Sequence, residues 1–519
     1  MKIFSAEQVR AIDNYTIKNE PIASIDLMER AAMRLTGWFV KKYKTDRDVV
    51  IFAGSGNNGG DSLAMSRMLA ERQYRVRCYL VSTGKKYAAN CELNLERLKS
   101  GGLAEINVIT GAEHLPELND KQVIVDGIFG SGLTRKVEGL YAEVIQCINE
   151  SKANVVSIDI PSGLFGEDNS DNNEKSIIRA DYTPTFQFPF LSFFFRENYK
   201  FTGEWTVIDI KLHPGAIENN KSEYAVSKMS GIQHIFPQRE RFSHKGTYGH
   251  ALVIAGKYGM MGAAILAGKS ALRAGAGLVT VHVPKLGCEI VQTAIPEAIV
   301  SIDQSEILFS KAPAMDGFHA VAVGPGIGKK PNSTKGLRAL LEMCKVPMVL
   351  DADALNIISL EKELVKLLPE NSILTPHPME FDRLVGSSVD GFERHKKQIA
   401  FSKENHVIMV LKGAYTGISF PDGSYVFNMK GNPGMATGGS GDVLTGIIVS
   451  LLARGIAPGD AAVSGVFLHG LAGDLAAEKM DQEAMIASDI IDNLGEAFKI
   501  IKAKPFLHEG RGTQFIAPI

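Results

Sequence analysis

The chain has 519 residues, 45% of them hydrophobic, and a formal net charge of -2. Such a length can bury two or three ordinary domain cores, and the dispersed Lys and Arg residues form no basic stripe for nucleic acid. No apolar run reaches the roughly 18 residues that a membrane helix needs, and the charged, amphipathic start differs from a signal sequence. We therefore expect a cytoplasmic protein that binds small molecules or other subunits, with no nucleic acid and no membrane as partner.

Short β-branched runs alternate with longer helical patterns along most of the chain. In the first half the runs are 48–54, 76–81, 122–130, 154–160 and 205–210, and in the second half they are 251–256, 277–283, 320–326, 347–355, 372–378 and 407–413. This rhythm predicts parallel strands joined by crossover helices. Polar, turn-rich sequence interrupts it at 211–243, so we predict two tandem α/β domains with a boundary near 225–240.

The segment TFQFPFLSFFF at 185–195 is aromatic throughout rather than at alternate positions. Few basic residues lie beside it, so a buried strand or a subunit interface is favoured over a membrane-surface patch. Exposed aromatic surface here would favour assembly, and a homo-oligomer is our expectation.

A glycine-rich loop follows the first predicted strand, and Gly54, Gly56 and Gly59 satisfy the G-x-G-x-x-G pattern. Asp61 places a carboxylate where a pyrophosphate would approach the helix, and the next strand ends in VSTGKK, without an acidic ligand for a ribose. Both features argue against an ordinary NAD site. The loop's polar side chains could alternatively only cap a helix and form turns.

Two further strand ends in this half carry acids. Asp126 lies in VDGIFGSGL, and Asp159 and Ser162 lie in SIDIPSGL. Parallel strands bring their carboxyl ends to one crevice. Acids and amides that converge there predict a cation site together with acid/base groups.

The segments GSGNNGGD, DGIFGSGL and DIPSGL together resemble the signature segments of the NAD(P)H-hydrate epimerase domain, although Ser62 stands where that family normally has glycine. The resemblance implies a Rossmann-like three-layer sandwich over 1–225. It also implies that Asn58, Asp126 and Ser162 hold K⁺, and that Asp159 transfers a proton at the carbon being epimerised. The substrate-binding residues that it implies are Asn57, Asn58, Gly59, Gly60, Asp61, Gly130, Ser131, Gly132, Leu133, Thr134, Arg135, Lys136 and Asp159.

The second half begins with a near match to a phosphate-binding P-loop, MGAAILAGKSALRAG. The P-loop spacing needs glycine at position 263, where this chain has Ala263, and AAILA favours a helix over a loop. Lys269 is therefore predicted to lie on a helix surface.

Four later strand ends could form a site: VGPGIG, LDADALN, LTPHPMEF and LKGAYT. Each also has a purely structural interpretation, in which the glycines form turns, Asp353 caps a helix and His377 belongs to a rigid loop. Taken together they repeat the crevice argument, because every one follows an apolar strand. His469, with apolar neighbours at helical spacing, is predicted to be a core histidine.

The stretch GNPGMATGGSGDVLTGII at 431–448 has the clearest chemical pattern of this half. Gly438, Gly439 and Gly441 allow backbone N–H groups to form an anion-binding nest at a helix start. Asp442 then lies beside the anion, where it could act as a base on a hydroxyl near a transferable phosphate. The alternative is a glycine-rich turn in which Asp442 is the N-cap.

These segments resemble the ribokinase-like superfamily and, more closely, the ADP-dependent (S)-NAD(P)H-hydrate dehydratase over about 244–475. The resemblance implies a ribokinase-like three-layer sandwich at 226–505, with a tail at 506–519 of unknown role. It implies Mg²⁺ and ADP as a co-substrate, with Asp442 as the catalytic group. The ADP-binding residues that it implies are Lys412, Gly413, Ala414, Tyr415, Thr416 and Gly441, and the hydrate-binding residues are Ala264, Gly326, His377 and Asp442.

The two resemblances together predict repair of hydrated nicotinamide nucleotides, by epimerisation of (R)- and (S)-NAD(P)HX and ADP-dependent dehydration of (S)-NAD(P)HX to NAD(P)H. Two alternatives remain open from the residues themselves. The second half could be an ATP-dependent kinase for a vitamin or sugar-like alcohol, and the first half could be a non-catalytic binding module. The residues alone do not separate ADP from ATP, or NADHX from NADPHX.

Overall fold

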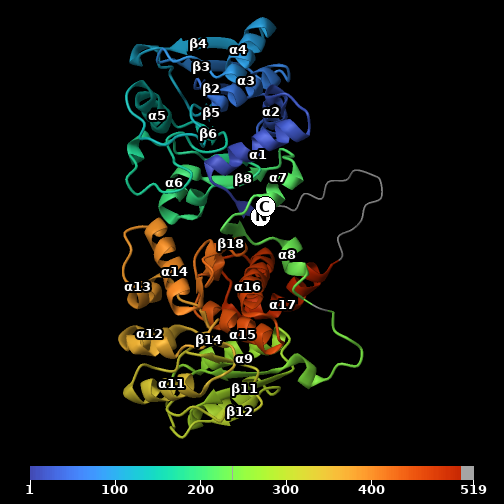
Figure 1. Cartoon of the computed structure of the whole chain (residues 1–519), viewed down its shortest axis with the longest axis vertical. Coiled ribbons are helices and arrows are strands. Elements are labelled where there is room, and N and C mark those ends of the chain that lie inside the picture. The colour runs from blue at the N-terminus through green and yellow to red at the C-terminus, as the bar shows by residue number, and fades with distance from the viewer. Residues whose placement is uncertain (237, 504–519) are drawn as a thin grey trace. The chain divides into compact units, whose positions relative to one another are not determined.

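The structure, a computed structural model, describes residues 1–236 and 238–503, so the tail predicted at 506–519 lies outside the described residues. The chain divides into two units (Figure 1). Unit 1 comprises Met1–Ala225 and Ser388–Lys396, and unit 2 comprises Val226–Ser387 and the residues from Lys397 onward. Each unit contains a sheet of mainly parallel strands, which confirms the predicted tandem α/β architecture.

Unit 1 is built on a parallel sheet with the strand order β4-β3-β2-β5-β6-β7-β8. The strands are β2 (Asp48–Ala53), β3 (Val76–Val81), β4 (Glu105–Ile109), β5 (Gln122–Gly127), β6 (Asn154–Ser157), β7 (Tyr182–Phe186) and β8 (Glu204–Ile208). The helices are α1 (Ala6–Asn19), α2 (Ser24–Lys42), α3 (Asn57–Ala70), α4 (Ala89–Gly101), α5 (Leu140–Glu150), α6 (Tyr199–Thr202) and α7 (Pro214–Asn219). A short antiparallel pair joins β1 (Lys2–Ile3) to β9 (Tyr224–Val226).

Both faces of the unit 1 sheet are buried. Along β2, Val49 and Ile51 pack with residues of α1, α2 and α3, whereas Val50 and Phe52 pack on the opposite face with residues of α5. Strands covered on both faces need continuous apolar runs rather than alternation, which is the pattern of the sequence. Unit 1 is therefore a three-layer α/β sandwich, as predicted.

Unit 2 contains strands in the order β18-β17-β16-β15-β14-β13-β10-β11-β12. They are β10 (His250–Ile254), β11 (Leu278–Val283), β12 (Ile299–Ile302), β13 (Ala320–Val323), β14 (Met348–Leu350), β15 (Ile373–Leu374), β16 (Ile408–Leu411), β17 (Thr416–Ser419) and β18 (Tyr425–Asn428). The helices are α8 (Met229–Gln233), α9 (Met261–Arg273), α10 (Cys288–Ala294), α11 (Pro331–Met343), α12 (Ala352–Leu360), α13 (Pro378–Val385), α15 (Ser440–Ala453), α16 (Pro458–Met480) and α17 (Ala487–Lys502), while α14 (Gly391–Asn405) begins in the segment grouped with unit 1. Only β17 and β18 run antiparallel to their neighbours among these strands.

Helices also cover both faces of the unit 2 sheet. Val253 packs with α9, α15 and α16, and its neighbour Leu252 packs on the other face with α11 and α12. Helices α9 and α15 approach each other closely at Gly446, where a Cβ atom would lie 2.1 Å from the carbonyl oxygen of Ala267 and 2.0 Å from Ser270 Oγ. Unit 2 is thus a second three-layer sandwich, and a side chain at Gly446 would force these helices apart.

The aromatic segment at 185–195 is buried inside unit 1. Its first residues end β7, and Leu191–Phe194 forms a short 3-10 helix rather than a continuation of the strand. Phe188, Phe193 and Phe194 are buried, and the last two pack against Trp205. The prediction of burial is confirmed, so this segment gives no exposed surface for assembly, and the homo-oligomer stays a prediction.

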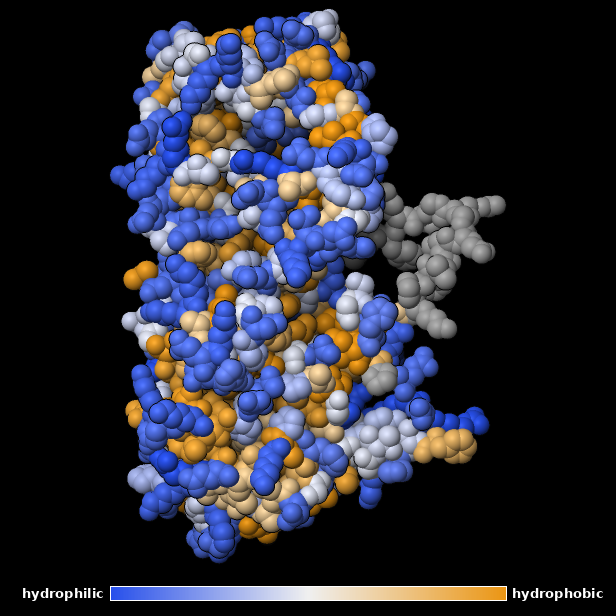
Figure 2. Space-filling model, viewed as in Figure 1, coloured by the Kyte–Doolittle hydropathy of each residue, from blue (hydrophilic) through white to orange (hydrophobic). Residues whose placement is uncertain are grey.

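Figure 2 shows hydrophilic residues spread over the visible face of both units, with apolar residues between them. None of the helices that the structure describes is long and apolar enough to cross a membrane. Lys269 lies on α9 and pairs with Asp492 at 3.6 Å, both of them substantially exposed. The P-loop resemblance at this lysine is therefore only apparent, as the spacing indicated.

Candidate active sites

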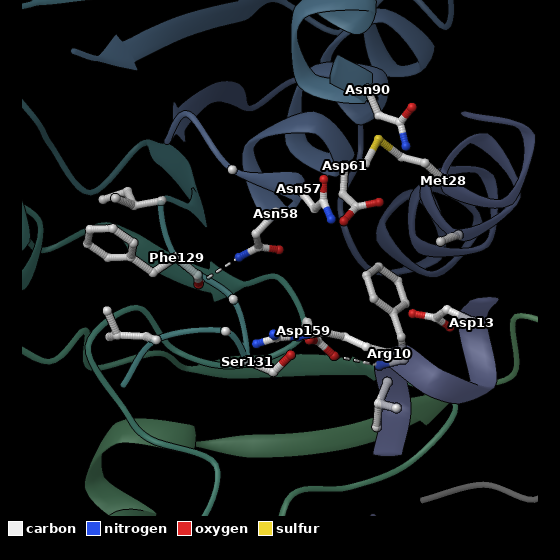
Figure 3. A pocket seen from close by; sticks show the side chains of 18 of the residues that line it. Arg10, Asp13, Met28, Asn57, Asn58, Asp61, Asn90, Phe129, Ser131 and Asp159 are labelled. Carbon is white, nitrogen blue, oxygen red and sulfur yellow. Dashed lines mark hydrogen bonds between the residues drawn. The ribbon is translucent and has the colours of Figure 1, made fainter. Parts of the chain in front are cut away.

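Unit 1 contains a cavity of about 1050 Å³ beside the carboxyl ends of β2, β5 and β6 (Figure 3). The predicted residues that line it are Asn57, Asn58, Asp61, Gly130, Ser131, Gly132, Leu133, Thr134, Arg135, Lys136 and Asp159. Two chain segments far apart in the sequence, the start of α3 and the loop after β5, thus form facing walls of one hollow. The crevice expected from parallel strand ends is present.

The glycines of the first loop allow α3 to begin close to the sheet. A Cβ atom at Gly59 would lie 1.9 Å from the carbonyl oxygen of Gly54, and one at Gly60 would lie 2.7 Å from Met28 Sδ. Gly59 and Gly60 are buried behind the cavity wall rather than lining it. Their contribution is close packing, which places the side chains of Asn57, Asn58 and Asp61 at the cavity.

The three predicted cation ligands meet around Phe129. Asn58 Nδ2 donates to the carbonyl oxygen of Phe129 at 2.8 Å, and Ser162 Oγ accepts from the Phe129 N–H at 2.8 Å. The Asp126 carboxylate is fully buried and accepts from Ser162 Oγ at 2.5 Å, the Ser162 N–H at 2.8 Å, Ser157 Oγ at 2.7 Å and the Ile128 N–H at 3.2 Å. Burial raises the pKa of Asp126, and these donors oppose the rise. The structure therefore brings an amide, a carboxylate and a hydroxyl into one connected cluster.

Asp159 is held rigidly at the cavity. Its Oδ1 atom accepts from the Phe186 N–H at 3.1 Å and from Thr185 Oγ1 at 3.2 Å. Its backbone φ of 68° lies in the left-handed region, which is uncommon for a residue other than glycine and is often retained at functional sites. Burial raises the pKa of Asp159 to about 6 against the effect of both donors. A carboxyl with this pKa can exchange a proton near neutral pH.

Helix α1 adds two charged residues to the cavity that sequence reasoning missed. Arg10 and Asp13 both line it, one turn apart on α1, and Figure 3 shows Asp13, Asp61 and Asp159 around the same hollow. Burial, followed by the charge of Asp159, raises the pKa of Asp13 to about 6. Burial and the charges of Asp159 and Asp13 raise the pKa of Asp61 well above its ordinary value. The amphipathic pattern of the N-terminal helix was visible in the sequence, but its packing beside the cavity was not.

The candidate residues of unit 2 gather at one edge of its sheet. Strands β13, β14, β15 and β16 are parallel neighbours, so the segments that follow them share that edge. The segments begin at Gly324, Asp351, Thr375 and Lys412 respectively. A Cβ atom at Gly326 would lie 3.4 Å from Ala263 Cβ, which places this loop against the start of α9, where Ala264 is buried.

A buried ion pair connects three elements at this edge. Lys412 Nζ lies 2.9 Å from Asp351 Oδ1, and Thr445 Oγ1 of α15 donates to Asp351 Oδ2 at 2.8 Å. A Cβ atom at Gly441 would lie 3.2 Å from Lys412 Nζ. Sequence reasoning had placed Lys412 and Gly441 in one site but had not singled out Asp351, which is the residue that joins them.

Asp442 occupies the third position of α15, so its interpretation as an N-cap is wrong. The N-cap is Gly439, whose φ of 92° is a left-handed conformation that glycine adopts freely. Burial, followed by the charge of Asp351, raises the pKa of Asp442 to about 7, and Lys412 opposes the rise. This carboxyl therefore has a pKa suited to a general base near neutral pH.

Three other residues have structural contacts. His377 caps α13, since its Nδ1 atom accepts from the Met379 N–H at 3.2 Å, as its loop position suggested. Asp353 is not a cap, because its Oδ2 atom accepts from the Gly328 N–H at 2.8 Å and so links two of the strand ends. His469 is buried and contacts Ser440 Oγ at 3.3 Å, which confirms it as a core histidine.

Comparison with known proteins gives matches for both units. The sequence pattern of the family described as YjeF-related protein N-terminus matches residues 24–191, and that of NAD(P)H-hydrate dehydratase matches residues 251–495. The bifunctional NAD(P)H-hydrate repair enzyme Nnr of Moorella thermoacetica is 35% identical over 514 residues, which cover 95% of this chain and 96% of that protein. The chain belongs to the bifunctional NAD(P)H-hydrate repair enzyme family.

Another curated relative and a solved structure are also similar to this chain. The enzyme of the same name from Escherichia coli is 31% identical over 87% of this chain and 85% of its own length. A crystal structure of the ADP/ATP-dependent NAD(P)H-hydrate dehydratase of Bacillus subtilis, co-crystallised with ATP/Mg²⁺, is 31% identical and covers 53% of this chain and 98% of that chain, with a TM-score of 0.48.

The two family matches cover most of both candidate sites. The dehydratase match includes every candidate residue of unit 2, from Ala264 to Asp442. The N-terminal match includes Asn57 to Ser162 but begins after α1. Arg10 and Asp13 therefore line the unit 1 cavity from outside the matched segment.

Proposed function

We propose that this chain repairs hydrated reduced nicotinamide nucleotides with two catalytic sites in one polypeptide. Residues 1–225 interconvert (R)- and (S)-NAD(P)HX, and residues 226–505 dehydrate (S)-NAD(P)HX to NAD(P)H with ADP, releasing AMP and phosphate. The observation that carries the proposal is the similarity to bifunctional repair enzymes over nearly the whole chain. Each unit also has a site with buried carboxyl groups. We expect the enzyme to act on these small nucleotides in the cytoplasm.

In unit 1, Asp159 is the proposed proton-transfer group. Its position between two hydrogen-bond donors fixes the carboxylate at the cavity, and its pKa of about 6 allows it to gain and lose a proton near neutral pH. The walls formed by Asn57, Asn58 and the loop from Gly130 to Lys136 would enclose the hydrate. Enclosure excludes bulk water from the reacting ring.

The cluster around Phe129 suits a hard monovalent cation. K⁺ prefers uncharged or carboxylate oxygen ligands, and the amide of Asn58, the buried carboxylate of Asp126 and the hydroxyl of Ser162 are such groups. These three residues would hold K⁺, which when bound would compensate the buried negative charge and orient the Asn58 amide.

In unit 2, Asp442 is the proposed base. A hydroxyl is a poor leaving group, so its conversion to a phosphate ester before elimination lowers the barrier. Asp442 would accept the proton of the substrate hydroxyl, and the backbone N–H groups at the start of α15 would bind the phosphoryl group. A bound Mg²⁺ would neutralise phosphate charge there. The proposed ADP contacts are Lys412, Gly413, Ala414, Tyr415, Thr416 and Gly441, and the proposed hydrate contacts are Ala264, Gly326, His377 and Asp442.

The test is to add the purified protein to an equimolar mixture of both NADHX epimers with ADP and Mg²⁺. We expect complete recovery of the dihydronicotinamide absorbance in wild type, and fast conversion of only half of the substrate in Asp159→Asn. Asp442→Asn should abolish the recovery while leaving epimer exchange intact. A stable phosphoester without recovery of absorbance would show a kinase instead, and loss of fast epimer exchange when K⁺ is replaced by choline would support the cation site.

A further inference from the structure

Helix α1 presents Asp13 to the unit 1 cavity without tying it to another protein group. Asp13 is the eighth residue of α1, so it caps neither end of the helix. In the part of the chain that the structure describes, its carboxyl has no hydrogen-bond or ion-pair partner. A partly buried carboxyl without a partner is costly, and such groups cluster at functional sites. A purely structural role therefore does not account for Asp13.

Asp13 shares the cavity with two other carboxyls that come from different elements. Asp61 lies on α3 and Asp159 follows β6, and Figure 3 shows all three around one hollow. Arg10, one turn before Asp13, is exposed to the cavity and reaches toward the opposite wall, since a Cβ atom at Gly132 would lie 3.3 Å from Arg10 Nη2. One face of α1 thus forms part of the cavity wall.

The chemistry of epimerisation calls for two proton-transfer groups. Water added at C6 makes that carbon a hemiaminal, bonded both to a hydroxyl and to the ring nitrogen N1. A base that removes the hydroxyl proton lets the O–H electrons form C6=O while the C6–N1 bond breaks. The electrons of that bond go to N1, which takes a proton from an acid, and the product is an open-chain aldehyde. Rotation about C5–C6 and reversal of both proton transfers close the ring with C6 inverted.

We propose that Asp13 is a catalytic residue of this epimerisation, donating the proton to N1 while Asp159 accepts the hydroxyl proton, and that ring closure returns both protons. The proposal rests on the proposed epimerase function of unit 1. Each turnover restores the starting protonation of the pair, so no co-reactant is needed. Asp159, which accepts two hydrogen bonds from the protein, is the member suited to carry the negative charge.

Asp61 is the competing candidate for the acid. Its pKa is raised well above the ordinary value, whereas that of Asp13 is raised only to about 6. An acid that must donate a proton and regain it in each cycle works best with a pKa near the operating pH. Asp13 meets this requirement, and Asp61 is better suited to keep its proton and bind the substrate as a hydrogen-bond donor.

The experiment starts from one purified NADHX epimer and follows the appearance of the other by chromatography, without ADP. For Asp13→Asn in the full-length protein we expect kcat to fall about 10²- to 10³-fold with KM within about threefold of wild type. Glu7→Gln makes the same charge change on the exposed face of α1 and should leave kcat unchanged. In Asp13→Ser, added formate should restore part of the lost kcat, because a small carboxylate can occupy the space of the missing group.

Trp38 and Trp205 both belong to unit 1, so tryptophan fluorescence during urea unfolding shows whether each variant is folded. If wild type does not accelerate epimer exchange, the proposed function itself fails. If wild type is active but either folded Asp13 variant keeps the wild-type kcat, or changes only KM, the role of Asp13 is refuted. Loss of kcat in Asp61→Asn with wild-type kcat in Asp13→Asn would assign the acid to Asp61 and equally overturn the proposal.

Discussion

Replacement of Lys412 by methionine tests the buried ion pair of unit 2. Lys412 Nζ lies 2.9 Å from Asp351 Oδ1, and the Asp351 side chain is 1% exposed, so Lys412→Met leaves a buried carboxylate without its cation. Removal of one partner from a buried ion pair costs about 3–5 kcal/mol. The Lys412 side chain is 23% exposed, and water can replace part of the lost interaction. We therefore expect the free energy of unfolding of unit 2 to fall by about 2–3 kcal/mol.

The assay uses the uneven distribution of tryptophan. Both tryptophans lie in unit 1, so fluorescence follows unit 1 while circular dichroism follows both units. Lys412→Met should lower the unfolding temperature of the transition that only circular dichroism detects by about 4–12 °C, at about 2–4 °C per kcal/mol. The transition seen by fluorescence should not move.

Lys269→Met is the matched control, because its pair with Asp492 is longer, at 3.6 Å, and exposed. Such surface pairs contribute about 0–1 kcal/mol. The double variant Lys412→Met/Asp351→Asn removes the uncompensated charge and should regain much of the stability. The reasoning is refuted if Lys412→Met costs no more than Lys269→Met, or if the double variant is less stable than the single one.

Three further predictions follow from other contacts. Burial raises the pKa of Asp442 from 3.8 to about 7, so the folded state holds this proton more tightly than the unfolded chain. Wild type should therefore lose stability relative to Asp442→Asn as the pH rises from about 4 to about 7, and its stability should change little above pH 7. Parallel curves of stability against pH for the two proteins, measured by urea unfolding, would contradict this. The wild-type dehydration rate should rise over the same interval as the base ionises. Gly446→Ala should lower the free energy of unfolding of unit 2 by about 1–3 kcal/mol, because its Cβ atom would clash with α9. Gly495→Ala, which has open space around it, should be neutral or slightly stabilising. Equal melting temperatures for the two variants would contradict the packing at Gly446. Ser162→Ala deletes the hydroxyl that donates to the Asp126 carboxylate and accepts from the Phe129 N–H, and should lower the stability of unit 1, measured by tryptophan fluorescence, by about 1–3 kcal/mol. An unchanged transition would contradict the contacts described.

The sequence predicted the fold well where the signal is local. Continuous apolar runs such as 48–54 and 251–256 became central strands, because a strand covered on both faces has no exposed position to alternate with. Strand β12 was missed, and its residues Ile299 and Ile302 are exposed at the edge of the sheet. The aromatic segment was predicted to be buried, but its change from strand to 3-10 helix depends on packing around Trp205, which no local pattern reveals.

The sequence could show which site residues lie near strand ends, but it could not show which of them contact one another. Asp126 lies at the carboxyl end of β5, and Asp159 and Lys412 each follow a strand. Parallel topology alone places such residues at the carboxyl edge of their own sheet. Asp13 precedes Asp159 by more than a hundred residues and lies on a helix whose pattern is that of any amphipathic surface helix, so only the packed structure shows that both face one cavity. Asp351 looked like one of two acids near a helix start, and only its contacts with Lys412 and Thr445 distinguish it from Asp353.

In unit 1 the segment 1–19 contacts residues that come about 200 positions later, and this has a consequence during synthesis. Lys2 and Ile3 pair with Ala225 and Tyr224, and Thr16 Oγ1 of α1 accepts from the His213 N–H. Helix α1 is made before these partners, which follow about 200 residues later, or about 10–40 s at about 5–20 residues per second. Until then part of the apolar face of α1 lacks its partners, and the cavity to which α1 contributes Arg10 and Asp13 cannot be complete before Ile210 and Leu212, which also line it, have been made.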